Sequence, residues 1–305
     1  MHGEHMEAEI REQPSALAAA RFFECLGDLE LRQPECVLLI ARGSSDHAAL
    51  YARYLIEVHL EIPAVLAAPS VWTRFGKRPR YRNALAVGIS QSGAAPDVAE
   101  VLAAMREDGH QTLAITNTEG SRITQAAEHT LLLGVGEERS IAATKTYTAS
   151  LLAMYELVRT LGGRLEGPVA PDEAWVEKAR SSAQEGLGPV LRCSPLFALG
   201  RGYGFATAQE TALKLMECAL LPCKAYSTAD FEHGPKALAG PGSTSVVFGE
   251  PASGEVVQAP EAPVSAELKP LWDIVFGQWL ALLAARARGL DPDAARNLSK
   301  VTETR

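Results

Sequence analysis

A lysine and a glutamate on one predicted helix have the types and spacing for acid–base chemistry. Lys214 and Glu217 lie three residues apart in the segment 211–217, and residues three apart share one face of a helix. The residues around them are mostly apolar, so the sequence predicts a partly buried carboxylate beside a cation. Burial raises the pKa of a carboxyl group and a neighbouring ammonium lowers it, which allows such a site to be tuned into a general base. An exposed ion pair on the helix surface is the alternative.

A histidine in a constrained loop is the second candidate. His233 is followed by Gly234 and Pro235, and this pair restricts the backbone that presents the imidazole. A loop histidine that is simply exposed to solvent is the alternative. Together with Lys214 and Glu217, it indicates an enzyme that uses acid–base chemistry and leaves the substrate open.

Two Ser/Gly-rich turns have the chemistry of an anion site. One turn contains Ser44 and Ser45, and the other is the run Ser90-Gln91-Ser92-Gly93. Hydroxyls, backbone N–H groups and a helix dipole can together bind a phosphate without a lysine. Ordinary helix capping is the alternative. Neither GxGxxG opening a dinucleotide unit nor GxxxxGK[ST] occurs, so nucleotide binding is disfavoured.

These turns belong to a repeated pattern of short apolar strand, turn and amphipathic helix. Such alternation predicts a parallel sheet with helices on both faces, and ligands at the carboxyl ends of its strands. The predicted strands are 36–41, 85–89, 112–116, 129–133, 196–200 and 244–248. The predicted helices are 46–58, 96–108, 145–161, 206–219 and 271–288.

The pattern restarts after a Gly/Pro-rich stretch at 162–171, which we interpret as a linker. The segments 39–55 and 197–213 share a strand, an Arg-Gly turn and a helix, which indicates a weak internal duplication. We therefore predict an α/β protein of two doubly wound, flavodoxin-like domains, 1–165 and 166–305. The second is predicted to be shortened, because 249–264 has no periodic helix.

The composition limits the environment and the partners. A net charge of −8 argues against a nucleic-acid surface, and the absence of a long apolar run argues against a membrane span. The first residues lack the apolar core of a secretion signal. The five cysteines form no CxxC pair, which favours reduced thiols, and we expect a cytoplasmic protein. No His/Cys/Asp cluster has metal-ligand spacing, so we expect neither a metal nor another cofactor.

Six motifs in order along the chain resemble one enzyme family. They are similar to the isomerase half of glucosamine-6-phosphate synthase and, more closely, to stand-alone glucosamine-6-phosphate deaminases of the sugar isomerase (SIS) type. The motifs are ARGSSDHA (41–48), ISQSG (89–93), AATKTYT (142–148), ALKLMECALLPCKAY (212–226), FEHGP (231–235) and RNLSKVTET (296–304).

The resemblance implies a role for each candidate residue. It implies that Glu217 moves a proton between C1 and C2 of the sugar, with Lys214 beside it. His233 matches the residue linked to ring opening, which in this family comes from the neighbouring subunit of a homodimer with a shared active site. Lys300 matches a lysine that closes over the open-chain sugar. The sugar-phosphate cradle is implied to consist of Ser44, Ser45, Ser90, Gln91, Ser92 and Gly93.

The implied reaction converts glucosamine 6-phosphate to fructose 6-phosphate and ammonia, and needs no hydride acceptor. Two departures from the family pattern concern the site. Ala95 stands where relatives carry a further hydroxyl, and the stretch after Phe248 lacks an expected strand–helix unit. No glutaminase domain and no N-terminal cysteine nucleophile are present, so glutamine-driven synthesis is not expected.

Two other interpretations stay open at this point. The first is a related enzyme that acts on galactosamine 6-phosphate or on a fructosyl-amine phosphate. The second is a sugar-phosphate sensor without turnover. The sensor is less favoured, because no basic helix-turn-helix precedes the predicted sheet and Glu217, His233 and Lys300 are all present.

Overall fold

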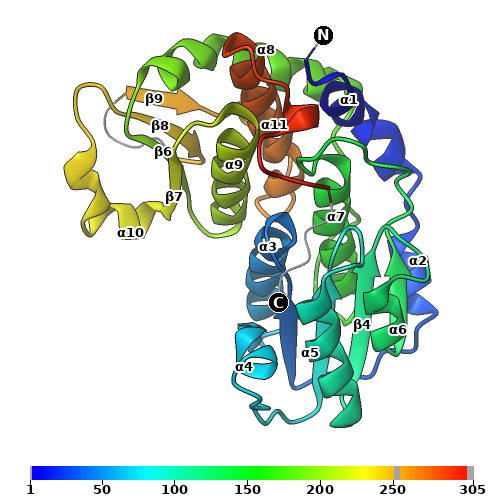
Figure 1. The fold of residues 1–305 in the computed structure, drawn as a ribbon. Coiled ribbons are helices and arrows are strands. Elements are labelled where there is room, and N and C mark those ends of the chain that lie inside the picture. Colours follow the sequence, from blue (N-terminus) through cyan, green and yellow to red (C-terminus); the bar gives the residue numbers. More distant parts are fainter. Residues whose placement is uncertain (1, 251–254, 301–305) are drawn as a thin grey trace. The chain divides into compact units, whose positions relative to one another are not determined.

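The computed structural model describes residues 2–250 and 255–300, which form two compact units, each with its own parallel sheet (Figure 1). The five-strand unit comprises residues 19–136 and 149–168. The four-strand unit comprises the described residues of 2–18, 137–148 and 169–300. The first helix and the segment 137–148, a loop that runs into the first residues of a helix, thus group with the C-terminal half of the chain. The domain boundary near residue 165 stays a prediction.

The sheet of the five-strand unit has the order β2-β1-β3-β4-β5, with every pair parallel. This is the doubly wound, flavodoxin-like order, so the predicted fold class is confirmed. Near-continuous apolar runs such as that of β1 are buried on both faces, as expected for a parallel sheet covered by helices. The strands are β1 (Cys36–Ile40), β2 (Ala64–Leu66), β3 (Ala84–Ile89), β4 (Gln111–Thr116) and β5 (His129–Leu132).

In this unit α3, α4, α5 and α6 connect successive strands, α2 precedes β1, and α7 follows β5, with its first residues grouped with the other unit. They are α2 (Phe22–Gly27), α3 (Ser44–His59), α4 (Ser70–Thr73), α5 (Pro96–Glu107), α6 (Arg122–Ala126) and α7 (Lys145–Thr160). A core of strand residues such as Leu38 and Ala86 packs against Val98 and Leu102 of α5. This packing holds the start of α5 at the carboxyl end of β3, where the predicted anion site begins.

The sheet of the four-strand unit has the order β7-β6-β8-β9, which repeats the first sheet without its last strand. Its strands are β6 (Leu196–Gly200), β7 (Cys223–Ser227), β8 (Thr244–Phe248) and β9 (Glu255–Gln258). The second sheet thus has one strand fewer than the first, in agreement with the shortening predicted for the second domain. β9 is the next strand after β8 and pairs with it in parallel.

The helices of this unit include one that is apolar on every side. α11 packs against α9 and α8, which explains why nearly all its residues are buried. The helices are α1 (Glu4–Ala18), α8 (Glu173–Arg192), α9 (Tyr203–Ala219), α10 (Thr228–Glu232) and α11 (Lys269–Ala287), with short 3₁₀ turns at Pro235–Leu238 and Pro292–Ala294.

The internal duplication is visible in the backbone. Gly43 before α3 has φ 56° and ψ −132°, and Gly202 before α9 has φ 56° and ψ −128°. A side chain is disfavoured at such positive φ values, so the glycine of each Arg-Gly turn allows the strand to pass directly into the helix. The two turns are equivalent parts of two related units.

Two general features of the sequence can be compared with the structure. Within the described ranges, no helix is both long and apolar enough to cross a bilayer. All five cysteines are free thiols, and Cys218 and Cys223 are buried.

Candidate functional site

The two predicted anion-binding turns leave the five-strand sheet side by side. β1 and β3 are neighbours in parallel register, with Ile40 opposite Gly88. The turn that carries Ser44 and Ser45 therefore begins next to the turn that begins at Ser90. In a doubly wound sheet this edge is the usual place for a ligand.

Hydrogen bonds fix the backbone of the second turn. The N–H of Gly93 donates to the Ser90 carbonyl at 3.0 Å. The Gln91 carbonyl accepts from the N–H of Asn117 at 3.0 Å and from Thr116 Oγ1 at 3.1 Å. These bonds tie the turn to the carboxyl end of β4, and they leave Ser90, Gln91 and Ser92 in one short, ordered segment.

The turn depends on a glycine at position 93. Gly93 has φ +64°, and a Cβ atom there would lie 2.0 Å from Ser121 Oγ and 2.3 Å from its Cβ. Both the backbone conformation and the close approach exclude a side chain. Gly93 therefore shapes the site and contributes no functional group of its own.

Both turns end in a helix that has no side-chain cap. Ser44 and Ser45 are the first residues of α3, whose N-cap is Gly43, and the N-cap of α5 is Ala95. Ala95 therefore offers no capping hydroxyl at the start of α5. An anion bound at these helix starts would meet backbone N–H groups and the positive ends of two helix dipoles.

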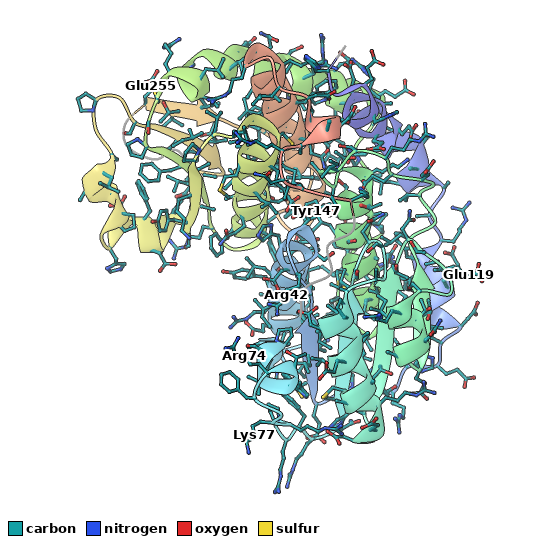
Figure 2. All side chains as sticks on the ribbon, viewed as in Figure 1. Arg42, Arg74, Lys77, Glu119, Tyr147 and Glu255 are labelled. Atoms are coloured by element: carbon teal, nitrogen blue, oxygen red, sulfur yellow. The ribbon has the colours of Figure 1, made fainter. Side chains whose placement is uncertain are left out.

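An ion pair that the sequence analysis missed connects the two turns. Nε of Arg42, labelled in Figure 2, donates to Asp97 Oδ2 at 2.7 Å, and Asp97 is buried. Asp97 also accepts from the N–H of Val98 in the first turn of α5. The only sequence signals were the arginine of the Arg-Gly turn and an aspartate at a helix start. The pair holds α5 against the end of β1.

In the four-strand unit, α9 places one ammonium between two carboxylates. Lys214 Nζ lies 2.6 Å from Glu217 Oε2 and 3.4 Å from Glu210 Oε1. The contact between Lys214 and Glu217 is the one that their spacing predicts. Glu210, one turn earlier, was not anticipated, although its spacing of four from Lys214 is an equally good signal.

The three side chains differ in exposure, and this decides what each can do. The side chains of Glu210 and Lys214 are 0% and 1% exposed, whereas that of Glu217 is 23% exposed. Burial lowers the pKa of Lys214, but the carboxylates of Glu210 and Glu217 outweigh it and hold this pKa above its ordinary value. The two carboxylates therefore favour the charged form of Lys214, and Glu217 is the member of the group that can reach a substrate.

His233 follows the helix that covers the face of the four-strand sheet opposite to α9. It follows α10, whose Phe231 packs on Phe197 of β6 with ring centroids 5.1 Å apart. A Cβ on Gly200 of β6 would instead meet Gly204 of α9. Because residues 197 and 200 of one strand face opposite sides, α10 and α9 cover opposite faces of the sheet. Within one chain, His233 and Glu217 are thus not brought together.

Lys300 is held by the loop 137–148. Its ammonium donates to Glu138 Oε2 at 2.7 Å and to the Ser140 carbonyl at 2.6 Å. Neither contact is to Lys214 or Glu217.

Glu138 was missed by the sequence analysis. Its side chain is fully buried and accepts hydrogen bonds from the backbone N–H and the hydroxyl of both Thr144 and Thr146. Burial raises the pKa of this carboxyl, but the Lys300 ammonium and the loop N–H groups hold it below its usual value. The signal was available in the motif AATKTYT, which contains both threonines.

Comparison with known proteins shows what the chain is similar to. Residues 30–159 match the model of the SIS domain. A glutamine–fructose-6-phosphate aminotransferase (isomerizing) of Methanothermobacter thermautotrophicus is 32% identical over 335 residues, which cover 97% of this chain and 56% of the relative. A Mycobacterium tuberculosis protein of the same name is 30% identical, with coverages of 97% and 57%. The chain thus spans a little over half the length of these curated relatives.

Two solved structures have the same fold over nearly the whole chain. A Silicibacter pomeroyi protein assigned as a phosphosugar isomerase has a TM-score of 0.77 and 27% identity, and the match covers 94% of this chain and 99% of that one. Glucosamine-6-phosphate deaminase of Thermotoga maritima has a TM-score of 0.81 and 24% identity, with coverages of 99% and 100%. At this identity the second likeness concerns the fold alone.

Proposed function

We propose that this chain, whose residues 30–159 match the model of the SIS domain, is a sugar-phosphate isomerase that converts glucosamine 6-phosphate and water to fructose 6-phosphate and ammonia. The observation that carries the proposal is the group on α9. Glu217 is a partly exposed carboxylate fixed at 2.6 Å by an ammonium that stays charged. A carboxylate of this kind can carry a proton between two carbons of a sugar, and the transfer needs no redox partner.

The turns of the five-strand unit supply the phosphate site of the proposal. Ser44, Ser45, Ser90 and Ser92 offer hydroxyls at two helix starts that side chains do not cap. The phosphate of a sugar phosphate carries the charge that such helix starts favour. The hydroxyl absent at Ala95 leaves one contact fewer than relatives have.

The proposed chemistry begins with the open-chain sugar, which has an aldehyde at C1 and an amine at C2. Glu217 removes the proton from C2, a C1=C2 double bond forms, and the C1 oxygen gains a proton. The same carboxyl then returns a proton to C1, and the nitrogen lone pair forms a C=N bond at C2. Water adds to this carbon and ammonia leaves, which produces the ketone of fructose 6-phosphate. Hydrogen-bond donors near the C1 oxygen would stabilise its developing charge.

The remaining two residues are assigned from the family pattern. Lys300 would contact the open-chain sugar from the C-terminal segment. His233 would assist ring opening, and its place on the sheet face opposite α9 supports a homodimer in which a second copy supplies it. The proposal therefore includes a shared site between two copies of the chain.

The test is product formation from glucosamine 6-phosphate, without glutamine or added metal. Equal amounts of ammonia and fructose 6-phosphate would support the proposal. Neither product, together with a higher unfolding temperature in the presence of the sugar, would overturn it in favour of a sensor. Turnover of galactosamine 6-phosphate or of a fructosyl-amine phosphate in its place would retain the acid–base chemistry and change the substrate.

A further inference from the structure

We propose that Glu138 is a positioning residue that holds Lys300, and with it the C-terminal segment 291–300, in place. The inference rests on the proposed function only for what Lys300 then does to the sugar. The contact itself joins residues 162 positions apart in sequence within the four-strand unit. Nothing in the residue types or spacing indicated it.

The carboxylate of Glu138 is held by hydrogen bonds from Thr144 and Thr146, in addition to its ion pair with Lys300. Four donors from Thr144 and Thr146 lie within 2.7–3.2 Å of its oxygens, and its side chain is 0% exposed. Burial of an ionised carboxylate is energetically unfavourable unless a nearby cation compensates its charge. Lys300, whose side chain is 26% exposed, supplies that cation from the solvent side.

The other cations of the segment 137–148 already have partners. Arg139 Nε lies 3.3 Å from Glu137 Oε2, and Lys145 Nζ lies 2.7 Å from Glu12 Oε2 of α1. Among the described residues, Lys300 is the cation within ion-pair distance of Glu138. The pairing is therefore specific within a loop that contains several charges.

A second carboxylate fixes the other acceptor of Lys300. Glu9 of α1 accepts from the N–H groups of Arg139 and Ser140, the latter at 3.2 Å. This contact positions Ser140, whose carbonyl receives the second hydrogen bond of Lys300. Burial and the nearby Glu138 raise the pKa of Glu9.

The C-terminal segment is also attached further upstream. Asp291 accepts from the N–H of Gly3 at 2.9 Å, and Asp293 accepts from that of Met6 at 3.0 Å, at the start of α1. Lys300 adds a second attachment at the loop. Two attachments leave only residues 294–299 between them, so the ammonium of Lys300 is confined to a small region.

The first test measures how readily Lys300 reacts with acetic anhydride, with peptide mass spectrometry of the whole chain as the readout. A lysine paired with a buried carboxylate is protected, so Glu138→Gln is expected to increase acetylation of Lys300 about tenfold, which corresponds to a lost interaction of about 1.4 kcal/mol. The control is Glu12→Gln, which removes the carboxylate that pairs with Lys145 and leaves the pair of Glu138 and Lys300 intact. In this variant the acetylation of Lys300 is expected to stay unchanged. Unchanged acetylation of Lys300 in Glu138→Gln would overturn the proposal.

The second test uses the thermal unfolding midpoint and remains available if Glu138→Gln folds poorly. Lys300→Met leaves the buried carboxylate without its cation and is expected to lower the midpoint, with partial recovery in Lys300→Arg. In the Glu138→Gln background, Lys300→Met is expected to have much less effect. Equal effects of Lys300→Met in both backgrounds, or no effect in the wild type, would contradict the pairing.

Turnover separates this inference from the proposed function. If glucosamine 6-phosphate is the substrate, Glu138→Gln should lower kcat and add nothing to the loss caused by Lys300→Met. Both physical tests require no turnover, so a chain without deaminase activity but with a protected Lys300 would contradict the function and leave the pairing intact.

Discussion

Lys214 Nζ lies 2.6 Å from Glu217 Oε2 and 3.4 Å from Glu210 Oε1, so one buried ammonium pairs with a buried carboxylate and a partly exposed one. Glu210 makes the ammonium important for stability, because a buried charge without a counter-charge is unfavourable. Glu217 uses the same ammonium to hold its position at the surface. Lys214 therefore compensates the buried charge of Glu210 and also positions Glu217, the proposed base.

Removal of that side chain should first affect stability. Lys214→Met leaves Glu210 without its cation and is expected to lower the free energy of unfolding by about 3–5 kcal/mol. The matched control is Lys236→Met, which breaks an exposed pair with Glu232 and should change this free energy by about 0–1 kcal/mol. Urea unfolding of both variants provides the comparison. Equal losses would mean that the pair on α9 is no more important than a surface pair.

Substitutions at two glycines should distinguish the cost of backbone strain from the cost of a steric clash in the turn 90–93. Gly93 and Gly76 have φ +64° and +59°, but a Cβ would meet Ser121 only at Gly93 and nothing within 4 Å at Gly76. Gly76→Ala therefore adds conformational strain alone, about 1 kcal/mol. Gly93→Ala adds a clash, and we expect a further loss of about 1–3 kcal/mol in urea unfolding together with weaker sugar-phosphate binding. Similar losses at both positions would show that the turn tolerates a side chain.

Asp273 should make stability depend on pH. Burial raises the pKa of this carboxyl on α11 to about 8, although Lys269 acts in the opposite direction. Between about pH 4 and pH 8 the folded state keeps a proton that the unfolded state releases. The favourable contribution of Asp273 is thus complete below pH 4 and is lost as the pH rises towards 8.

The variant Asp273→Asn should remove this dependence. The free energy of unfolding of the wild type should fall across the window by up to about 1.4 kcal/mol per pH unit more than that of the variant. Asp28→Asn, an exposed aspartate with the same substitution, serves as the control. Denaturant unfolding at several pH values gives the slopes, and parallel curves for wild type and Asp273→Asn would contradict the prediction.

The ion pair between Arg42 and Asp97 should influence substrate binding. Arg42→Ala frees the start of α5 from the end of β1, and we expect the affinity for a sugar phosphate to fall about tenfold, or about 1.4 kcal/mol. Arg53→Ala, which breaks the exposed pair with Glu57 on α3, should leave the affinity unchanged. Titration calorimetry compares the two, and equal affinities of both variants would rule out a role for the pair in binding.

The elements that could be predicted from sequence are those with a strong local pattern. β8 begins and ends as predicted, and α7 differs from its prediction by a single residue. β2 has only three residues and β7 mixes buried and exposed positions, so neither had a recognisable period. α8 was missed because Gly186, Gly188 and Pro189 lie in its last turns and resemble a loop.

The same distinction applies to the candidate site. Lys214 and Glu217 are three residues apart, so helix geometry alone predicts their contact. Arg42 and Asp97 are 55 positions apart, and Glu138 and Lys300 are 162 apart. Contacts of this kind depend on how the chain folds back on itself, and residue types alone do not specify them.

The most direct test of the proposed reaction compares the wild type with Glu217→Gln in one assay that measures both ammonia and fructose 6-phosphate from glucosamine 6-phosphate. The substitution keeps the shape of the side chain, and Lys214 retains Glu210 as a partner, so the fold should persist. We predict equimolar products from the wild type and a rate about 10²–10⁴ times lower in the variant, with sugar-phosphate binding preserved. Equal rates in the two proteins, or no product from the wild type, would contradict the account.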